Sequence, residues 1–148
     1  KIQKCNIEKE RLPFQSNSFQ TILFAEVFEH LRIDPIFTLK EINRVLSKEG
    51  VLILTTPNLY SISTIVSFLM GQGFNNAYFE FEKLHKLGHM GHIRVYSSKE
   101  MTEFLEKTGF RVIKAKYRSY HNNPLLKYTS LILPPFLRST QVIICRKK

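Results

Sequence analysis

The sequence has little cysteine, no tryptophan and no apolar run of membrane-spanning length. The longest apolar stretch, near Ile62 to Met70, is too short to cross a bilayer. Cys5 and Cys145 lie in strand-like runs without metal-ligand spacing, so buried reduced thiols are a better interpretation than a disulfide. The first residues lack the apolar core of a signal peptide. We therefore expect a cytoplasmic protein with no metal held by its cysteines.

Glycine-rich turns are also missing. The six glycines include no Gly-x-Gly after a strand, the turn that lets backbone approach a nucleotide cofactor. Gly71-Gln72-Gly73 is no such turn, because it follows an apolar helical stretch rather than a strand. Whatever cofactor the chain binds, the sequence predicts no glycine-rich loop for it.

Acidic residues are scarce in the second half of the chain. The net charge is +10, and residues 83–148 hold 14 basic and 3 acidic residues, whereas residues 1–82 hold 8 and 9. Such an excess fits a phosphate-bearing substrate, a nucleic acid or an anionic membrane surface. Because the lysines are scattered, it equally fits a solvated basic face. Nucleic acid rests on charge alone and is the least favoured of these partners.

The best-defined feature is a strand, helix and strand in succession. Thr21–Val27 and Val51–Thr56 are apolar runs of strand length, which predicts two buried parallel strands. The helix between them has Asp34 as its cap, Pro35 in its first turn and Gly50 at its end. With 43% apolar residues over 148 positions, the chain is predicted to form one α/β domain.

These residues resemble the second half of the catalytic domain of class I S-adenosylmethionine-dependent methyltransferases, nearest to the ubiquinone/menaquinone-methylase-like group. The matching pieces, in order, are Leu12-Pro13-Phe14, Phe19, Glu29-His30-Leu31, Asp34-Pro35, Arg44-Val45-Leu46, Gly50, Pro57-Asn58, His92-Ile93-Arg94-Val95-Tyr96-Ser97 and Gly109-Phe110. The resemblance covers nearly the whole chain except about residues 70–91 and 119–138.

The resemblance implies a Rossmann-like, three-layer α/β/α sandwich with a mostly parallel sheet. It gives the strand order Thr21–Val27, Val51–Thr56, Thr140–Cys145, Phe110–Tyr117, with only the third strand antiparallel. Residues 1–148 would be one partial methyltransferase domain that lacks the family's N-terminal strands and helices. Residues 71–91 would be a variable insertion or lid, and residues 119–139 an apolar connection.

The resemblance also implies S-adenosylmethionine as cofactor. Lys1–Ile7 would be a strand that brings Asn6 and Ile7 to the adenine, and Ala25 with Glu26 would approach the methionine end. An asparagine amide oxygen can accept the hydrogen bond that an aspartate accepts in the family. An Asn that simply ends a strand is an equal alternative.

For the methyl acceptor, the resemblance points to residues beyond the carboxyl ends of the strands. His30 is the candidate catalytic base, although a histidine with a structural role is the alternative. Asn58, His92 and Tyr96 are candidate acceptor contacts, and Asn58 can instead cap the next helix. His85, His89 and His92 lack the fourth ligand of a structural zinc site, so we predict no metal there.

Two functions follow. The first is methyl transfer to a small-molecule acceptor such as a lipid, a quinone-like compound or a glycan precursor. The second is a non-catalytic α/β fragment or interaction module. Without the glycine-rich turn, we expect the 148-residue chain to bind the cofactor weakly or not at all. We also expect a partner on the apolar edge of Thr21–Val27: the first strand, an exchanged element or a second copy in a homodimer.

Overall fold

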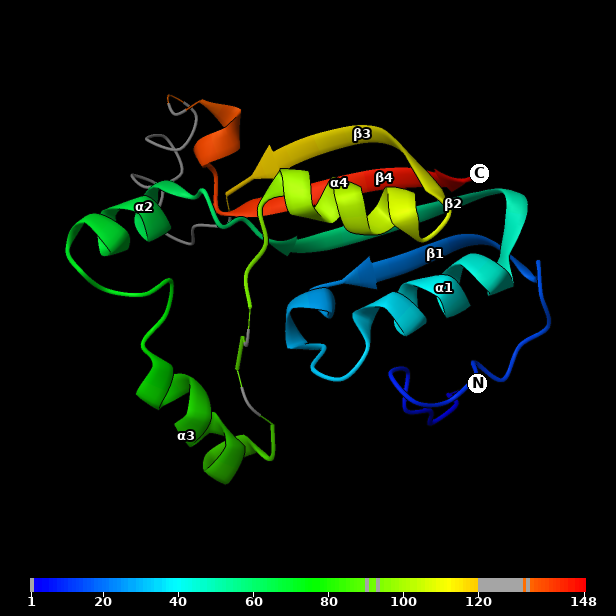
Figure 1. Cartoon of the computed structure of the whole chain (residues 1–148), viewed down its shortest axis with the longest axis horizontal. Coiled ribbons are helices and arrows are strands. Elements are labelled where there is room, and N and C mark those ends of the chain that lie inside the picture. The colour runs from blue at the N-terminus through cyan, green and yellow to red at the C-terminus, as the bar shows by residue number, and fades with distance from the viewer. Residues whose placement is uncertain (1, 90, 93, 120–131, 133) are drawn as a thin grey trace.

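The computed structural model describes residues 2–89, 91, 92, 94–119, 132 and 134–148. The elements, in chain order, are β1 (Phe19–Ala25), the 3-10 helix η1 (Phe28–His30), α1 (Pro35–Val45), β2 (Leu46–Pro57), α2 (Ile62–Leu69), α3 (Ala77–Leu87), α4 (Ser98–Lys107), β3 (Phe110–Arg118), the 3-10 helix η2 (Pro135–Leu137) and β4 (Thr140–Lys147) (Figure 1).

The four strands form one mixed sheet in the order β1-β2-β4-β3. β1 runs parallel to β2, with Leu23 opposite Ile53, and β4 runs antiparallel to both of its neighbours. This confirms the predicted order and the single antiparallel strand. Because β1 and β2 are parallel, their carboxyl ends meet at the same edge of the sheet.

The crossover between β1 and β2 begins as predicted and ends earlier. Asp34 Oδ1 accepts a hydrogen bond of 2.8 Å from the backbone N–H of Phe37, and a proline occupies the first turn of α1. The prediction that Gly50 ends the helix is wrong, because α1 stops at Val45 and Leu46 already has extended backbone angles. Leu46 is fully buried, so its packing overrides the helical pattern of the sequence.

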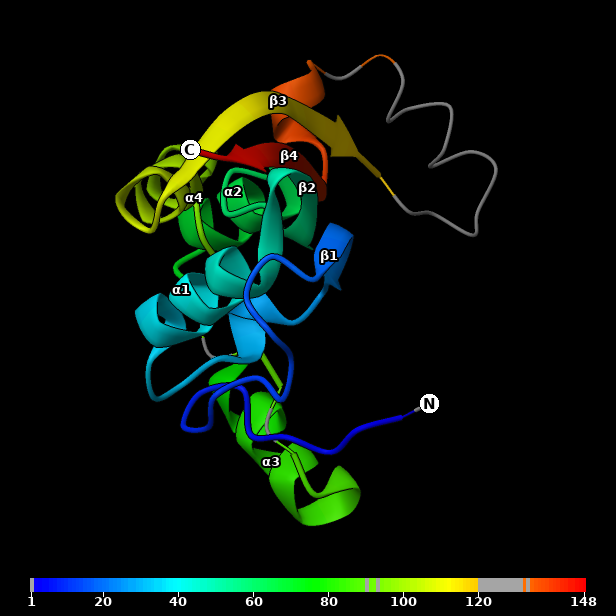
Figure 2. The ribbon, with the colours of Figure 1, turned by 90° about the vertical axis from the view of Figure 1, so that its right-hand side faces the viewer.

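The core lies between one face of the sheet and two helices, α1 and α4, which both cover that face (Figures 1 and 2). Its central side chains include Phe28, Leu39, Leu52, Leu54 and Ile143, all fully buried. Among the described residues no helix covers the opposite face, where Leu23 and Ile113 are 67% and 51% exposed. The helix layer that the sandwich fold would place there is not part of the described structure.

The expected strand at Lys1–Ile7 is wrong for the part of it that the structure describes. Residues 2–6 have no regular structure, and the backbone N–H groups of Lys9 and Glu10 turn back onto the carbonyl of Asn6. The Asn6 side chain also accepts from the backbone N–H of Glu8. Asparagine offers the backbone such local turns in competition with a strand. Cys5 is accordingly half-buried outside the sheet, whereas Cys145 is buried in β4.

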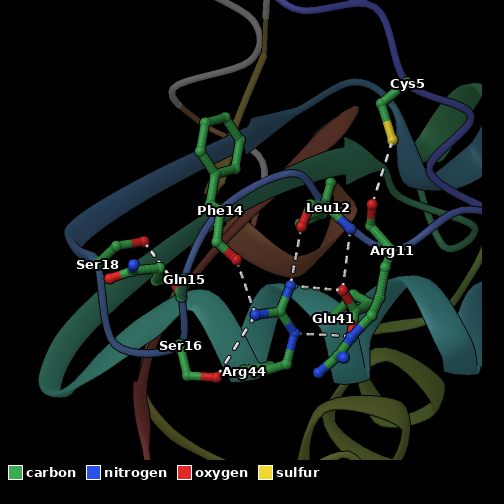
Figure 3. A network of polar contacts seen from close by, with 9 residues as sticks. All are labelled: Cys5, Arg11, Leu12, Phe14, Gln15, Ser16, Ser18, Glu41 and Arg44. Atoms are coloured by element: carbon green, nitrogen blue, oxygen red, sulfur yellow. Dashed lines mark hydrogen bonds and ion pairs between the residues drawn. The ribbon is translucent and has the colours of Figure 1, made fainter.

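A network centred on Arg44 fixes the segment before β1 to α1 (Figure 3). The guanidinium donates to both carboxylate oxygens of Glu41, at 2.9 and 2.8 Å, and to the carbonyls of Leu12 and Phe14, at 3.0 and 2.9 Å. It also donates to Ser16 Oγ at 3.4 Å. Glu41 accepts a further bond of 3.0 Å from the backbone N–H of Leu12. Arg44 thereby sets the path of the chain into β1.

The helices after β2 differ in how well the sequence predicted them. α4 begins with the capping box that Ser97 and Glu100 favour in the sequence, because the two residues exchange backbone and side-chain hydrogen bonds. α3 was not predicted; Asn76 caps it and Gly88 ends it in the left-handed conformation. Most of the predicted apolar connection at 119–139 lies outside the described residues. No helix among the described residues is long and apolar enough to span a membrane.

Candidate active site

The candidate site lies at the carboxyl ends of β1 and β2. The chain leaves β1 through Glu26, whose backbone adopts the left-handed conformation with φ of 52°. Its N–H donates to the carbonyl of Thr55 at 2.9 Å, and its Oε1 accepts from Thr55 Oγ1 at 2.7 Å. A non-glycine residue in this region is strained and held by its surroundings. Ala25 and Glu26 are both exposed at this edge.

Behind Glu26, a carboxylate is buried without full hydrogen bonding. Glu29 lies in η1 and has no exposed surface. Its Oε2 accepts from Thr56 Oγ1 at 2.9 Å, whereas Oε1 has no hydrogen-bond partner. Burial raises the pKa of Glu29 to about 6, and the neighbouring Glu26 carboxylate adds to the rise. Glu29 therefore holds a proton, or attracts a cation, more readily than a solvent-exposed glutamate does.

Two histidines lie beside this carboxylate. His92 Nε2 is 4.0 Å from Glu29 Oε1, and the His30 and His92 ring centroids are 4.9 Å apart. Burial and the His30 charge lower the pKa of His92 below its ordinary value. His30 Nδ1 lies 3.2 Å from the carbonyl oxygen of Gly91. A carbonyl only accepts, so Nδ1 carries a proton, and in the neutral imidazole Nε2 is then the atom with the lone pair.

The segment that carries His92 is held by α3. The backbone N–H of His92 donates to Glu80 Oε2 at 2.8 Å, and that of Gly91 donates to the carbonyl of Glu80 at 3.1 Å. A Cβ at Gly91 would collide with the Glu80 carboxylate, so a larger residue at this position would force that side chain to move. Glu80 is also paired with Lys83 at 2.7 Å. His92 is thus positioned by a helix that the sequence analysis did not predict.

An apolar cavity of about 280 Å³ adjoins His92. It is lined by Gly73, Phe74, Asn75, Ala77, Glu80, Phe81, Gly91 and His92. Its size is near the lower end of small-ligand pockets, and its lining combines aromatic surface with three polar side chains. Residues 71–91, expected as a lid, supply most of this lining.

Two predicted acceptor contacts are buried side chains. Asn58 is 2% exposed, and its amide donates to the carbonyls of Phe136 and Arg138 at 2.7 and 2.8 Å. Tyr96 is 4% exposed, and its ring packs against Phe28 at a centroid distance of 5.0 Å. Their role as acceptor contacts stays a prediction.

The predicted adenine contacts, Asn6 and Ile7, lie near the start of α1. The carbonyl of Ile7 accepts from Thr38 Oγ1 at 3.0 Å, near the start of α1. Glu8 Oε1 accepts from the backbone N–H groups of Arg32 and Ile33, both at 2.6 Å. Asn6 is exposed, although its Oδ1 already accepts from Glu8. The structure thus places Asn6 and Ile7 beside the loop that follows η1.

Sequence reasoning found His30 and His92 separately and missed Glu29 as their partner. The triplet Glu29-His30-Leu31 was noted only for its resemblance, and an isolated glutamate in an apolar surrounding carries no spacing signal. Of the three clustered histidines, His85 is exposed on α3, and the ring centroid of His89 lies 6.4 Å from that of His30. The residues that lie close together in the structure are therefore Glu29, His30 and His92, rather than His85, His89 and His92.

A model of the methyltransferase domain family matches residues 3–115. The chain belongs to this methyltransferase family, which implies S-adenosylmethionine as its cofactor. No Gly-x-Gly turn follows any of the four described strands.

Known proteins similar to the chain include one sequence relative and several solved structures. An uncharacterised protein of Methanocaldococcus jannaschii is 30% identical over 80% of this chain and 50% of its own length. A methyltransferase structure from Thermotoga maritima is 21% identical, with a TM-score of 0.65, over 99% of this chain and 63% of its own. Another, from Archaeoglobus fulgidus, is 13% identical with a TM-score of 0.62, over 98% and 66%. At these identities the two structures show the fold, and the chain spans about half the length of the curated relative.

Proposed function

We propose that this chain serves S-adenosylmethionine-dependent methyl transfer to a small-molecule acceptor. The observation that carries the proposal is the convergence of Glu26, Glu29, His30 and His92 at the carboxyl ends of β1 and β2 in a chain of the methyltransferase family. Ligands of open α/β sheets bind at this edge. When bound, the cofactor supplies an electrophilic methyl group, so the protein contributes mainly orientation.

The exposed residues divide the proposed cofactor site into two ends. Ala25 and Glu26 face the methionine end, where the Glu26 carboxylate, fixed by Thr55, accepts a hydrogen bond from an ammonium group. Asn6 and Ile7 face the adenine, through the Asn6 amide and the Ile7 backbone. For Asn6 to accept from the adenine, its Oδ1 must share or exchange the bond from Glu8.

The cavity beside His92 is the proposed acceptor pocket. Its aromatic lining favours a lipid or quinone-like acceptor over a glycan precursor, because a glycan would leave hydroxyl groups unpaired against Phe74 and Phe81. Across from the cavity, His30 Nε2 has a free lone pair beside His92. His30 is therefore the proposed base that accepts a proton from the acceptor.

The 148-residue chain by itself is proposed to bind the cofactor weakly. The chain offers contacts to the two ends of the ligand but no glycine-rich turn. A hydrogen bond to a charged group contributes about 1.5 to 3 kcal/mol, and about 1.4 kcal/mol is tenfold in affinity. A cofactor site that lacks two such bonds would therefore bind in the millimolar range instead of the micromolar range. Weak binding also leaves the isolated chain inactive at ordinary cofactor concentrations.

Calorimetric titration of the chain with S-adenosylmethionine tests the proposal, with ATP as a control that shares the adenosine and lacks the methionine. We expect saturable binding of S-adenosylmethionine in the millimolar range and weaker binding of ATP. Equal affinity for the two ligands, or no saturable binding, would overturn the cofactor site. A micromolar one-to-one complex would overturn the proposal that the chain offers only part of the site.

Two further partners are proposed for exposed apolar surfaces. Among the described residues β1 pairs only with β2, so its free edge fits a homodimer.

At the end of α2, Leu69 and Met70 are 83% and 68% exposed, and the chain is basic, which fits an anionic membrane surface. Sedimentation with phosphatidylglycerol vesicles should retain the chain, whereas phosphatidylcholine vesicles should not; equal retention by both would remove the membrane proposal.

A further inference from the structure

We propose that Glu29, His30 and His92 form a binding site for a divalent transition-metal ion. Each residue offers one ligand atom, and these three atoms lie within 4.8 Å of one another. They come from η1 and from the segment before α4, so the site joins two parts of the chain that are far apart in sequence. The sequence analysis predicted no metal at the cysteines or at His85, His89 and His92; the proposed set keeps only His92 of those residues and adds Glu29 and His30.

The buried carboxylate is the strongest argument. Glu29 is fully buried, and its Oε1 points toward His92 with no donor of its own. Thr56 satisfies only the other oxygen. An unpartnered buried carboxylate oxygen is costly unless it is protonated or paired with a cation. A metal ion between Glu29 and the histidines would remove that cost directly.

The histidines are arranged as ligands. The Gly91 carbonyl fixes the proton of His30 on Nδ1, which leaves Nε2 as the free donor atom, the usual support for a metal-bound histidine. His92 presents Nε2 toward the carboxylate, while its backbone is held by Glu80 on α3. Both rings are only partly buried, so they can rotate without disturbing the core.

The distances need a small closure. Ligands at about 2.1 Å in a tetrahedral site stand about 3.4 Å apart, compared with 4.0 Å between Glu29 Oε1 and His92 Nε2. Rotation of the two histidine side chains covers that difference. Two imidazoles and one carboxylate suit zinc, cobalt, iron or manganese better than magnesium, which prefers oxygen ligands.

Three protein ligands leave at least one coordination position open. Because His92 also lines the apolar cavity, the open position would face the acceptor pocket. This step rests on the proposed function: the ion would hold an oxygen of the acceptor and lower the pKa of a bound hydroxyl. His30 Nε2 would then be a ligand rather than a base, so the two roles exclude each other.

The test uses the tag-free 148-residue chain and metal ions alone, without cofactor or acceptor. Calorimetry with Zn²⁺ should give one site per chain, and Co²⁺ should give visible absorption bands of a site with nitrogen ligands. His92→Ala should weaken binding by at least about tenfold. His85→Ala, which removes an exposed histidine of α3 outside the site, should leave the affinity within about twofold.

The proposal is overturned if the wild-type chain shows no one-to-one binding, or if His85→Ala weakens binding as much as His92→Ala. Glu29→Gln, which keeps the shape of the side chain, should also weaken Zn²⁺ binding and lose the stabilisation by Zn²⁺ in thermal unfolding. If Glu29→Gln does not fold, His92→Ala still decides the question, because His92 is outside the core. Metal binding is measured without the cofactor, so its failure leaves the methyl-transfer proposal intact.

Discussion

Replacing Arg44 with methionine should destabilise the fold much more than its helical position alone suggests. The side chains of Arg44 and Glu41 are only 18% and 10% exposed, so this ion pair differs from a surface pair worth about 0 to 1 kcal/mol. The change also removes the guanidinium bonds to the carbonyls of Leu12 and Phe14, of which Leu12 keeps its bond from the backbone N–H of Phe14. We expect the free energy of unfolding to fall by about 3 kcal/mol, because each hydrogen bond to a charged group contributes about 1.5 to 3 kcal/mol and part of the network is exposed to solvent.

Urea unfolding followed by far-ultraviolet circular dichroism measures this loss, and a thermal scan should show a fall in Tm of about 6 to 12 °C. Lys40→Met is the matched control, because Lys40 is exposed on the same helix and the change in charge is the same. It should alter the free energy of unfolding by less than about 0.5 kcal/mol. Equal effects of the two substitutions, or a loss below about 1 kcal/mol for Arg44→Met, would refute the reasoning.

Three other predictions concern the same fold. Hydrogen bonds from Arg44 lower the pKa of Glu41 in the folded chain, so its contribution to stability is present above its unfolded pKa, near 4.5, and is lost as pH falls through the folded pKa. In urea unfolding, the loss in free energy of unfolding caused by Glu41→Gln should therefore shrink below about pH 4.5. A loss that stays constant with pH would contradict this. Gly91→Ala should displace Glu80 and weaken Zn²⁺ binding by at least about tenfold in calorimetry, while Gly73→Ala, with only an Asn75 backbone contact, serves as the control. Sedimentation should show a dimer that forms with rising concentration; a monomer whose β1 amides exchange freely would exclude pairing through that edge.

The apolar runs, the cap at Asp34 and the Ser97 capping box are local signals that packing reinforces. The runs were sufficient to predict strands of the sheet, and the caps indicate where α1 and α4 begin. The sequence was insufficient where packing opposed a local signal. Gly50 looked like a helix end, yet burial of Leu46 starts β2 four residues earlier. Asn6 looked like the end of a strand, yet its side chain forms a turn with Glu8.

The candidate site was predictable only in part. Position at the carboxyl end of a strand and the family resemblance predicted Ala25 and Glu26 as cofactor contacts; both are exposed, and their contact with the cofactor stays a prediction. Burial could not be read from the sequence: Asn58 and Tyr96 are buried polar side chains, while Glu29 gained its importance from a buried oxygen left without a donor. Pairing between η1 and residue 92 spans more than sixty positions, and no local pattern in one sequence encodes it.

Residue-resolved NMR tests the central claim, that the carboxyl ends of β1 and β2 form the cofactor edge of a methyltransferase site. Amide spectra of the ¹⁵N-labelled chain are recorded during titration with S-adenosylmethionine. We predict that shift changes concentrate at Ala25, Glu26 and Thr55 and saturate in the millimolar range, while Glu49 and Lys147 at the other end of the sheet stay unchanged. Changes centred on those two residues, or none at all near Glu26, would contradict the account.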